Sequence, residues 1–145
     1  MLIRSAQLQD LNACLALDAN SQTDHVWQMD AREDEGRVIR FHTVRLPRVM
    51  RVAYPRVRDD LLDCWEEGAS VLVAVEPRPA DLSTTEEGEG EAQALVLGYC
   101  QLDAQPWQEA GWISHLIVGR PFRRRGVGTV LLKAAKAWAY QLELK

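Results

Sequence analysis

Apolar residues along the chain form two kinds of pattern, continuous runs and stripes at helical spacing. The continuous runs lie at residues 2–4, 71–75, 95–102 and 111–118. Short apolar runs of this kind predict strands buried in a sheet. We expect residues 71–75 and 95–102 to pair as an antiparallel hairpin.

Three stripes at helical spacing predict amphipathic helices. They are the segment from a start at Ser5 or Gln7 to Leu17, the segment from a cap at Asp59 or Asp60 to Gly68, and residues 127–142. The last of these is expected to pack its apolar stripe on the sheet. Gly68 follows the second stripe, as glycine commonly follows a helix.

The remaining segments are polar or irregular. They comprise a predicted loop at residues 20–36 with room for a short helix, an extended strand at 38–46 that ends at Pro47, irregular structure at 49–58, a mobile loop at 76–94 and the start of a further strand at 141–145. Within the first loop, Trp27 either lines an acceptor pocket or covers the core, and the sequence leaves both interpretations open.

Length and charge narrow the class of protein. The 145 residues are enough for one domain with a sizeable core. The formal net charge of −4 argues against nucleic acid as the main partner. Arg120 and Arg123 to Arg125 nevertheless form a local basic cluster, which suits the phosphates of a coenzyme better than a nucleic acid.

The cysteines and the N-terminus indicate the environment of the protein. Cys14, Cys64 and Cys100 are scattered and odd in number, so their spacing predicts neither a disulfide framework nor a metal site. A reducing cytoplasm is the expected location. The N-terminus carries no long apolar segment, and no run reaches membrane-spanning length, so we expect no contact with a membrane.

The most informative motif joins the last apolar run to the last helical stripe. It reads Arg123-Arg124-Arg125-Gly126-Val127-Gly128. Two glycines allow the backbone to fold closely round an anion, and a helix that starts there points unpaired N–H groups and its positive dipole end at a phosphate. A Walker loop and a dinucleotide fingerprint both require further residues that are missing here. The motif therefore predicts a pyrophosphate site.

This motif resembles the R/Q-x-x-G-x-G/A signature of the GNAT superfamily of acyl-CoA-dependent N-acyltransferases. The flanking residues are similar too, because Leu116 and Val118 fill the L-x-V pattern of the preceding strand, and Phe122 is the aromatic residue before the arginine. Pro121 lies one position later than the usual proline of the family. The turn geometry is therefore expected to differ slightly.

The resemblance implies an α/β (α+β) fold, with a mixed, mostly antiparallel sheet flanked by helices. It covers residues 1–145 as a single domain that runs through the coenzyme motif and its helix. The family sheet normally continues with further strands after this helix, so the resemblance implies a C-terminally incomplete sheet. A homodimer that covers the open sheet edge is expected as one way to bury it.

The resemblance also implies acetyl-CoA as co-substrate, with no metal. Main-chain groups of the strand would bind the pantetheine amides, and N–H groups of the loop would hold the pyrophosphate. The implied coenzyme-binding residues are Leu116, Ile117, Val118, Arg123, Arg124, Arg125, Gly126, Val127, Gly128 and Thr129.

The implied reaction is N-acetylation by direct attack of an amine on the thioester, which needs a base and an acid. His115 and Ser114 are the candidate bases on the strand, Glu109 is a weaker option, and Tyr99 is the candidate acid. Strand alternation predicts that Ser114 and His115 face opposite sides of the sheet. Their roles stay open, because histidine or tyrosine on a strand is often structural.

Two hypotheses of different class follow. One is an N-acetyltransferase acting on a small-molecule or peptide amine, with specificity set by residues 20–60. The alternative is a non-catalytic module that binds the coenzyme or a protein partner, which the absence of a clear acid favours.

Overall fold

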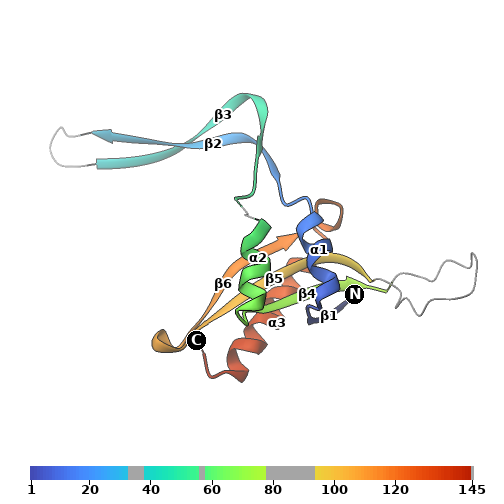
Figure 1. Ribbon diagram of the computed structural model, residues 1–145. Helices are drawn as coiled ribbons and strands as arrows, with labels where there is room; N and C mark the ends of the chain where they lie inside the picture. The colour runs from blue at the N-terminus through green and yellow to red at the C-terminus, as the bar shows by residue number, and fades with distance from the viewer. Residues whose placement is uncertain (33–37, 56–57, 78–93, 145) are drawn as a thin grey trace, which may run out of the picture. The chain divides into compact units, whose positions relative to one another are not determined.

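The computed structural model describes residues 1–32, 38–55, 58–77 and 94–144 (Figure 1). The predicted mobile loop at 76–94 falls largely outside these residues. The helices and strands are β1 (Leu2–Ser5), α1 (Leu8–Ala16), β2 (Ser21–Arg32), β3 (Val38–Val52), α2 (Arg58–Glu66), β4 (Ser70–Glu76), β5 (Leu95–Gln105), η1 (Pro106–Gln108), β6 (Ala110–Val118), η2 (Arg120–Phe122) and α3 (Val127–Gln141).

The chain divides into two compact units, each considered by itself below. The larger unit combines residues 1–19 with residues 56–145, and the smaller unit spans residues 20–55. In the described part of the chain, no helix is both long and apolar enough to cross a membrane.

The larger unit is built on an antiparallel sheet with the strand order β1-β4-β5-β6 among its described residues. The predicted pairing of residues 71–75 with residues 95–102 is confirmed, with Leu72 opposite Cys100 and Val73 opposite Tyr99. β6 forms one edge of this sheet, and it leads directly into the glycine motif.

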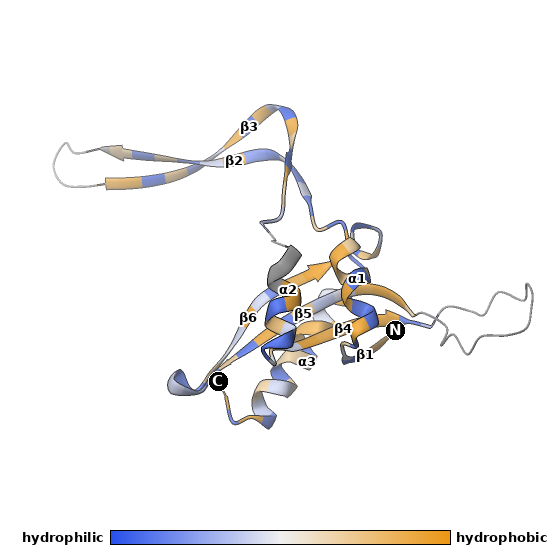
Figure 2. Ribbon diagram, in the orientation of Figure 1, coloured by the Kyte–Doolittle hydropathy of each residue, from blue (hydrophilic) through white to orange (hydrophobic). Residues whose placement is uncertain are grey.

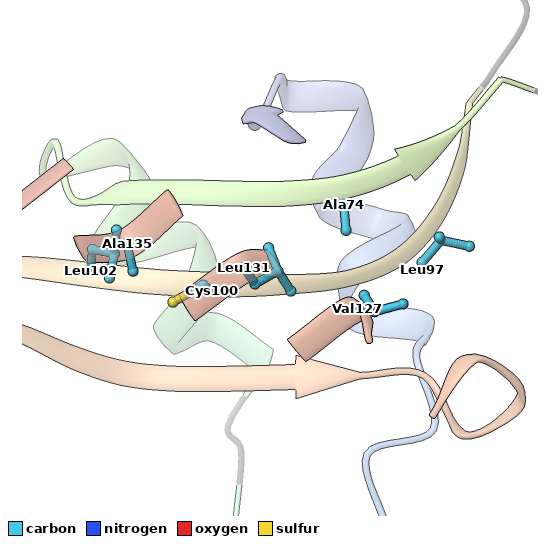
Figure 3. Packing of buried hydrophobic residues seen from close by; sticks show 7 residues of the cluster. All are labelled: Ala74, Leu97, Cys100, Leu102, Val127, Leu131 and Ala135. Atoms are coloured by element: carbon cyan, nitrogen blue, oxygen red, sulfur yellow. The ribbon is translucent and has the colours of Figure 1, made fainter. Parts of the chain in front are cut away.

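Helices cover both faces of the sheet, as predicted for the fold class. Figure 1 shows α1 and α2 on one face and α3 on the other. The apolar stripe of α3 packs against β4 and β5, and Figure 3 shows the resulting cluster from close by. Its buried members are Ala74, Leu97, Cys100, Leu102, Val127, Leu131 and Ala135. Burying a leucine side chain such as Leu131 contributes about 1.5–3 kcal/mol, so α3 and the strands stabilise each other.

Gly98 allows β5 and β6 to lie unusually close together. A Cβ at this position would lie 2.6 Å from the carbonyl oxygen of Ile117 and 3.2 Å from the Cα of Val118. Both atoms belong to the backbone and cannot move aside like a flexible side chain. The end of β6 that delivers the glycine motif is therefore held in place by a position that only glycine can fill.

Helix termini in the larger unit agree closely with the sequence pattern. Gln7 is the N-cap of α1, as expected, and its N–H donates to Asp10 Oδ2 at 2.8 Å. α2 begins at Arg58, slightly before the predicted caps at Asp59 or Asp60. Gly68 ends this helix with φ 91°, and the N–H of the following residue donates to the Cys64 carbonyl.

The prediction of a further strand at residues 141–145 is wrong for the described residues. Leu142 caps α3, and Glu143 adopts a left-handed φ of 55°. The N–H of Leu144 then donates to the carbonyl of Ala139 at 2.9 Å. These bonds satisfy carbonyl groups at the end of α3, so the residues complete the helix terminus instead of extending along a new strand.

The smaller unit corrects two predictions. Residues 20–36 are largely strand, since β2 pairs with β3 from Ser21 to Arg32. The strand predicted to end at Pro47 instead continues to Val52. Pro47 lies where the register shifts between Thr23 and His25, and a residue without an N–H is tolerated at such an irregularity. β2 is rich in polar residues, so the alternation of its side chains between two faces becomes clear only from its pairing with β3.

Candidate functional site

The glycine motif forms a turn between β6 and α3 with two left-handed residues. η2 leads into Arg124 at φ 63° and Gly126 at φ 81°. Glycine adopts this conformation without strain, whereas it is uncommon for arginine. Gly126 is the N-cap of α3, which begins at Val127. The sequence correctly predicted the strand, the loop and the helix in this order.

The start of α3 offers unpaired donors. Gly126 provides no side chain to cap the helix, and its carbonyl accepts the first backbone bond from Val130 at 3.1 Å. The N–H groups of the first helical turn have no acceptor within the helix. They carry the positive end of the helix dipole, so this position favours an anion.

A cavity of about 500 Å³ lies against these donors. Its lining residues are Val118, Phe122, Arg123, Arg124, Gly126, Val127, Gly128 and Thr129. The structure thus brings together most of the residues that the motif assigned to the coenzyme. A Cβ on Gly128 would meet only a side-chain methyl group of Val118 at 3.6 Å, so this glycine is not required by packing within the protein.

Arg123 holds the loop in place. Its Nε donates to the carbonyl of Val118 at 3.0 Å, and its Nη2 donates to the carbonyl of Asp18 at 3.2 Å. These bonds tie the turn to the end of β6 and to the segment that follows α1. The first arginine of the motif is therefore a positioning residue in this structure, whereas the exposed Arg124 side chain borders the cavity.

Three predicted coenzyme residues are absent from the lining of this cavity. Leu116 and Ile117 lie on the edge strand β6, one partly exposed and the other buried, and their predicted contacts involve the main chain. Arg125 is exposed on the turn. The edge position of β6 leaves one side of its backbone without a neighbouring strand in the described part of the sheet, which is the arrangement that main-chain binding requires.

A bulge in β6 changes the expected orientation of Ser114 and His115. His115 lies opposite Gln101 and Ile113 opposite Leu102, so Ser114 has no partner residue on β5. The Ser114 hydroxyl bonds to the carboxylate of Asp103, two positions from Gln101 and on the same face of β5. Ser114 and His115 therefore face the same side, and the prediction from strict alternation is wrong, because an extra residue shifts the alternation.

Asp103 bonds to Ser114, and Gln101 lies opposite His115. The sequence indicated neither Asp103 nor Gln101 as a candidate site residue. Both lie on the face of β5 opposite the α3 cluster. Asp103 also borders a cavity of about 270 Å³ that includes Glu67 and Cys64 of the α2 region. Gln101 is 2% exposed, and its Oε1 has no hydrogen-bond partner among the described residues. The term bulge cluster below means Gln101, Asp103, Ser114 and His115.

The other candidates occupy different surroundings. Tyr99 lies on the same face as the bulge cluster but is fully buried, opposite Ile117. Glu109 ends η1 with a left-handed φ of 51°, close to the start of β6. Trp27 belongs to the smaller unit, where its side chain is exposed. Within the described residues, no group of His, Cys, Asp or Glu has an arrangement suited to a metal ion.

Comparison with known protein families gives the class of this protein. Residues 50–145 match the family described as acetyltransferase (GNAT), and the chain belongs to this family. The resemblance inferred from the glycine motif is thereby confirmed.

Solved structures with the same fold include two acetyltransferases. Nourseothricin acetyltransferase aligns with a TM-score of 0.67 and 18% identity over 99% of this chain and 68% of its own. A putative streptothricin acetyltransferase from Bacillus anthracis str. Ames, solved in complex with acetyl coenzyme A, aligns with a TM-score of 0.62 and 19% identity over 99% and 70%. At these identities the likeness concerns the fold. A comparison with curated proteins gives no match.

Proposed function

We propose that the protein transfers an acetyl group from acetyl-CoA to an amine by direct attack. The observation that carries this proposal is the cavity at the N-terminus of α3, where uncapped N–H groups and a left-handed Gly126 line one wall. Membership of the acetyltransferase family supports it, as does the likeness to a protein solved with acetyl coenzyme A.

The residues present fit the pyrophosphate of this co-substrate. N–H groups from Arg124 to Thr129 would donate to its oxygens, and the Arg124 side chain would add positive charge at the rim of the cavity. Main-chain groups of Leu116, Ile117 and Val118 on the edge strand would hold the pantetheine amides. Arg123 and the exposed Arg125 would contribute by positioning the loop and by charge.

The proposed reaction forms an amide and releases a thiol. The amine nitrogen attacks the thioester carbonyl carbon, the carbon–sulfur bond breaks, and the nitrogen loses a proton while the thiolate gains one. A covalent intermediate on Cys100 is disfavoured, because burial raises the pKa of its thiol to about 11. At neutral pH this thiol stays protonated and is a poor nucleophile.

The bulge cluster supplies the groups for proton transfer in this proposal. His115 is the base that takes the proton of the amine, because a neutral imidazole has a ring nitrogen that accepts a proton. Asp103 attracts a cationic amine and is itself positioned by the hydroxyl of Ser114. Tyr99 is the candidate proton donor to the thiolate. Tyr99 is fully buried, so its side chain could also serve packing alone. Tyr99→Phe should lower kcat if the hydroxyl donates the proton, and it should change only stability if the side chain serves packing.

The acceptor is proposed to be a small cationic amine, with a peptide amine as the alternative. The names of the two solved relatives refer to small-molecule acceptors, and Asp103 and Glu67 give the adjacent cavity two acidic residues. We further propose that both units belong to one acetyltransferase domain, because the alignments extend over 99% of this chain. The free cysteines suit a cytoplasmic location.

The test is release of free coenzyme A thiol from acetyl-CoA in the presence of a panel of small amines and lysine peptides. Acceptor-dependent release that saturates with the amine supports the proposal. Coenzyme binding without release for any acceptor would favour a non-catalytic coenzyme-binding module. Absence of coenzyme binding by the folded chain would contradict both functions.

A further inference from the structure

The two faces of the hairpin formed by β2 and β3 differ, because three successive cross-strand pairs on one face carry no charge. Residues directly opposite each other in the register share a face, and successive pairs alternate between faces. On one face, three successive pairs are apolar or uncharged: Trp27 with Thr43, Met29 with Phe41 and Ala31 with Ile39. These six residues are called the apolar face below, and the next pair on the same side of the hairpin is His25 with Arg45. The opposite face carries the polar pairs Gln28 with His42 and Asp30 with Arg40, which lie between the pairs Val26 with Val44 and Arg32 with Val38. His42 Nδ1 lies 3.4 Å from Asp30 Oδ2. Figure 2 shows the alternating orange and blue segments along both strands.

Nothing within the hairpin covers the apolar face. Trp27 is 72% exposed and Phe41 is 63% exposed, and the side chains of Met29 and Ile39 are also mostly exposed. A two-stranded sheet without a layer packed against it is at best marginally stable in water. Adjacent large apolar side chains of this kind mark an interaction surface.

We propose that this apolar face binds the same face of a second copy of the chain, and that the two hairpins form a two-layer sandwich. A twofold axis parallel to the strands stacks β2 of one copy on β3 of the other. Each residue then faces the counterpart of its own cross-strand neighbour. Trp27 meets Thr43 of the second copy, Ala31 meets Ile39, and the Met29 thioether meets the ring of Phe41.

The sizes of these residues make the apolar face complementary to itself. The bulky Trp27 faces a small threonine, and the small Ala31 faces a branched isoleucine. Large residues opposite small ones interlock in well-packed layers. The exposed parts of the four largest side chains amount to about 500 Å² per copy, and about 1,000 Å² in a symmetric pair reaches the lower limit of a specific interface.

The charges also favour this face over its opposite for self-association. The apolar face has no charged residue from Trp27 to Ala31 or from Ile39 to Thr43. On the other face, a twofold stacking would bring Arg40 and Asp30 out of water in both copies, which opposes association.

An exchange of two residues tests the proposal on the full chain by sedimentation velocity over a range of concentrations. We expect the wild-type chain to sediment as a dimer. Thr43→Trp places two tryptophans opposite each other, a pair that a hairpin accommodates, yet it overfills the sandwich. Trp27→Thr leaves a gap. Each change is expected to weaken dimerisation at least tenfold, and the double exchange W27T/T43W is expected to restore it.

A pair of double variants provides the matched control. M29T/F41T removes apolar side chains from the apolar face and is expected to give a monomer, whereas Q28T/H42T on the opposite face leaves the dimer intact. Threonine favours strands, so both variants keep the hairpin, and circular dichroism verifies this. A monomeric wild-type chain would overturn the proposal and indicate that the face packs within its own chain. A dimer that survives M29T/F41T and Thr43→Trp would also overturn it, because the interface would then lie elsewhere, such as the free edge of β6.

Discussion

Two stretches of β6 and its connection to α3 present different kinds of chemical group. The loop after Val118 offers backbone N–H groups, and its shape depends on Gly126 and on the bonds of Arg123. The bulge at Ser114 offers side chains, and their arrangement depends on the pairing of β6 with β5. The loop presents backbone groups, which an added side chain can block, whereas the bulge cluster presents the side chains themselves. Mutations in the two places should therefore affect different steps.

The largest effect is expected from the bulge cluster on turnover. His115→Asn should lower kcat by about 10²–10⁴-fold, the usual contribution of general acid–base catalysis, whereas Asp103→Asn should mainly raise the KM of the amine. Acetyl-CoA affinity should stay essentially unchanged, because neither residue lines the loop cavity. Steady-state kinetics and calorimetry on the same preparations check both statements. A parallel loss of coenzyme affinity would remove the distinction between the two stretches.

A charge in the loop should abolish coenzyme binding and leave the fold intact. Gly126→Asp places a carboxylate where the pyrophosphate is expected, and we expect a loss of affinity of about 100-fold or more. Asparagine has nearly the same shape, and both residues tolerate a left-handed φ better than most. Gly126→Asn is therefore the matched control and should bind at least tenfold more tightly than Gly126→Asp in calorimetry. Equal affinities would show that charge is not the cause.

Gly128→Ala should separate stability from binding. The added Cβ meets only the Val118 methyl group at 3.6 Å, and alanine favours a helix by up to about 1 kcal/mol over glycine. Thermal unfolding should therefore show equal or higher stability. The same methyl group blocks close approach of a phosphate, so acetyl-CoA affinity should fall about tenfold. Unchanged affinity would mean that the phosphate does not approach this turn of α3.

A change remote from both stretches should alter stability alone. Burial raises the pKa of Asp10, but bonds from the Arg4 side chain and the Gln7 N–H, together with the Arg4 charge, outweigh burial and leave it lowered. Its stabilisation is therefore fully present above the unfolded pKa near 3.8 and is lost as the pH falls through the lower folded value. Asp10→Asn should cost about 1–3 kcal/mol at pH 7 and progressively less as the pH falls below 3.8, as measured by urea unfolding. A constant difference across this range would contradict the ion pair with Arg4.

The loop could be predicted from the sequence, and the bulge cluster could not. The loop depends on neighbours in sequence, since Gly126 fixes the turn and α3 follows at once. The bulge depends on how β6 aligns with residues of β5 about a dozen positions earlier, and strict alternation gives the wrong face for Ser114. Asp103 becomes a candidate site residue only in the folded chain, where the Ser114 hydroxyl bonds to its carboxylate.

The smaller unit shows the same limit. Trp27 and Met29 lie two positions apart, but the polar residues around them indicated a loop. Their strand is defined by the pairs that they form with β3, such as Met29 with Phe41. Pro47 looked like a strand end, because proline has no N–H to donate to a partner strand, but β3 tolerates it where the register with β2 shifts. Patterns of neighbouring residues predicted the helices and strands of the larger unit. The hairpin could not be predicted in this way, because its strands are defined by pairing between segments that are distant in sequence.

The central claim is that the start of α3 binds the pyrophosphate of acetyl-CoA, and amide NMR of the ¹⁵N-labelled chain tests it most directly. Acetyl-CoA and acetylpantetheine, which lacks the pyrophosphate, are titrated in parallel. If the loop holds the pyrophosphate, acetyl-CoA should shift the amides of Gly126, Val127, Gly128 and Thr129 most strongly, and acetylpantetheine should leave them nearly unchanged. Saturable binding of acetyl-CoA that leaves these four amides unmoved would contradict the claim.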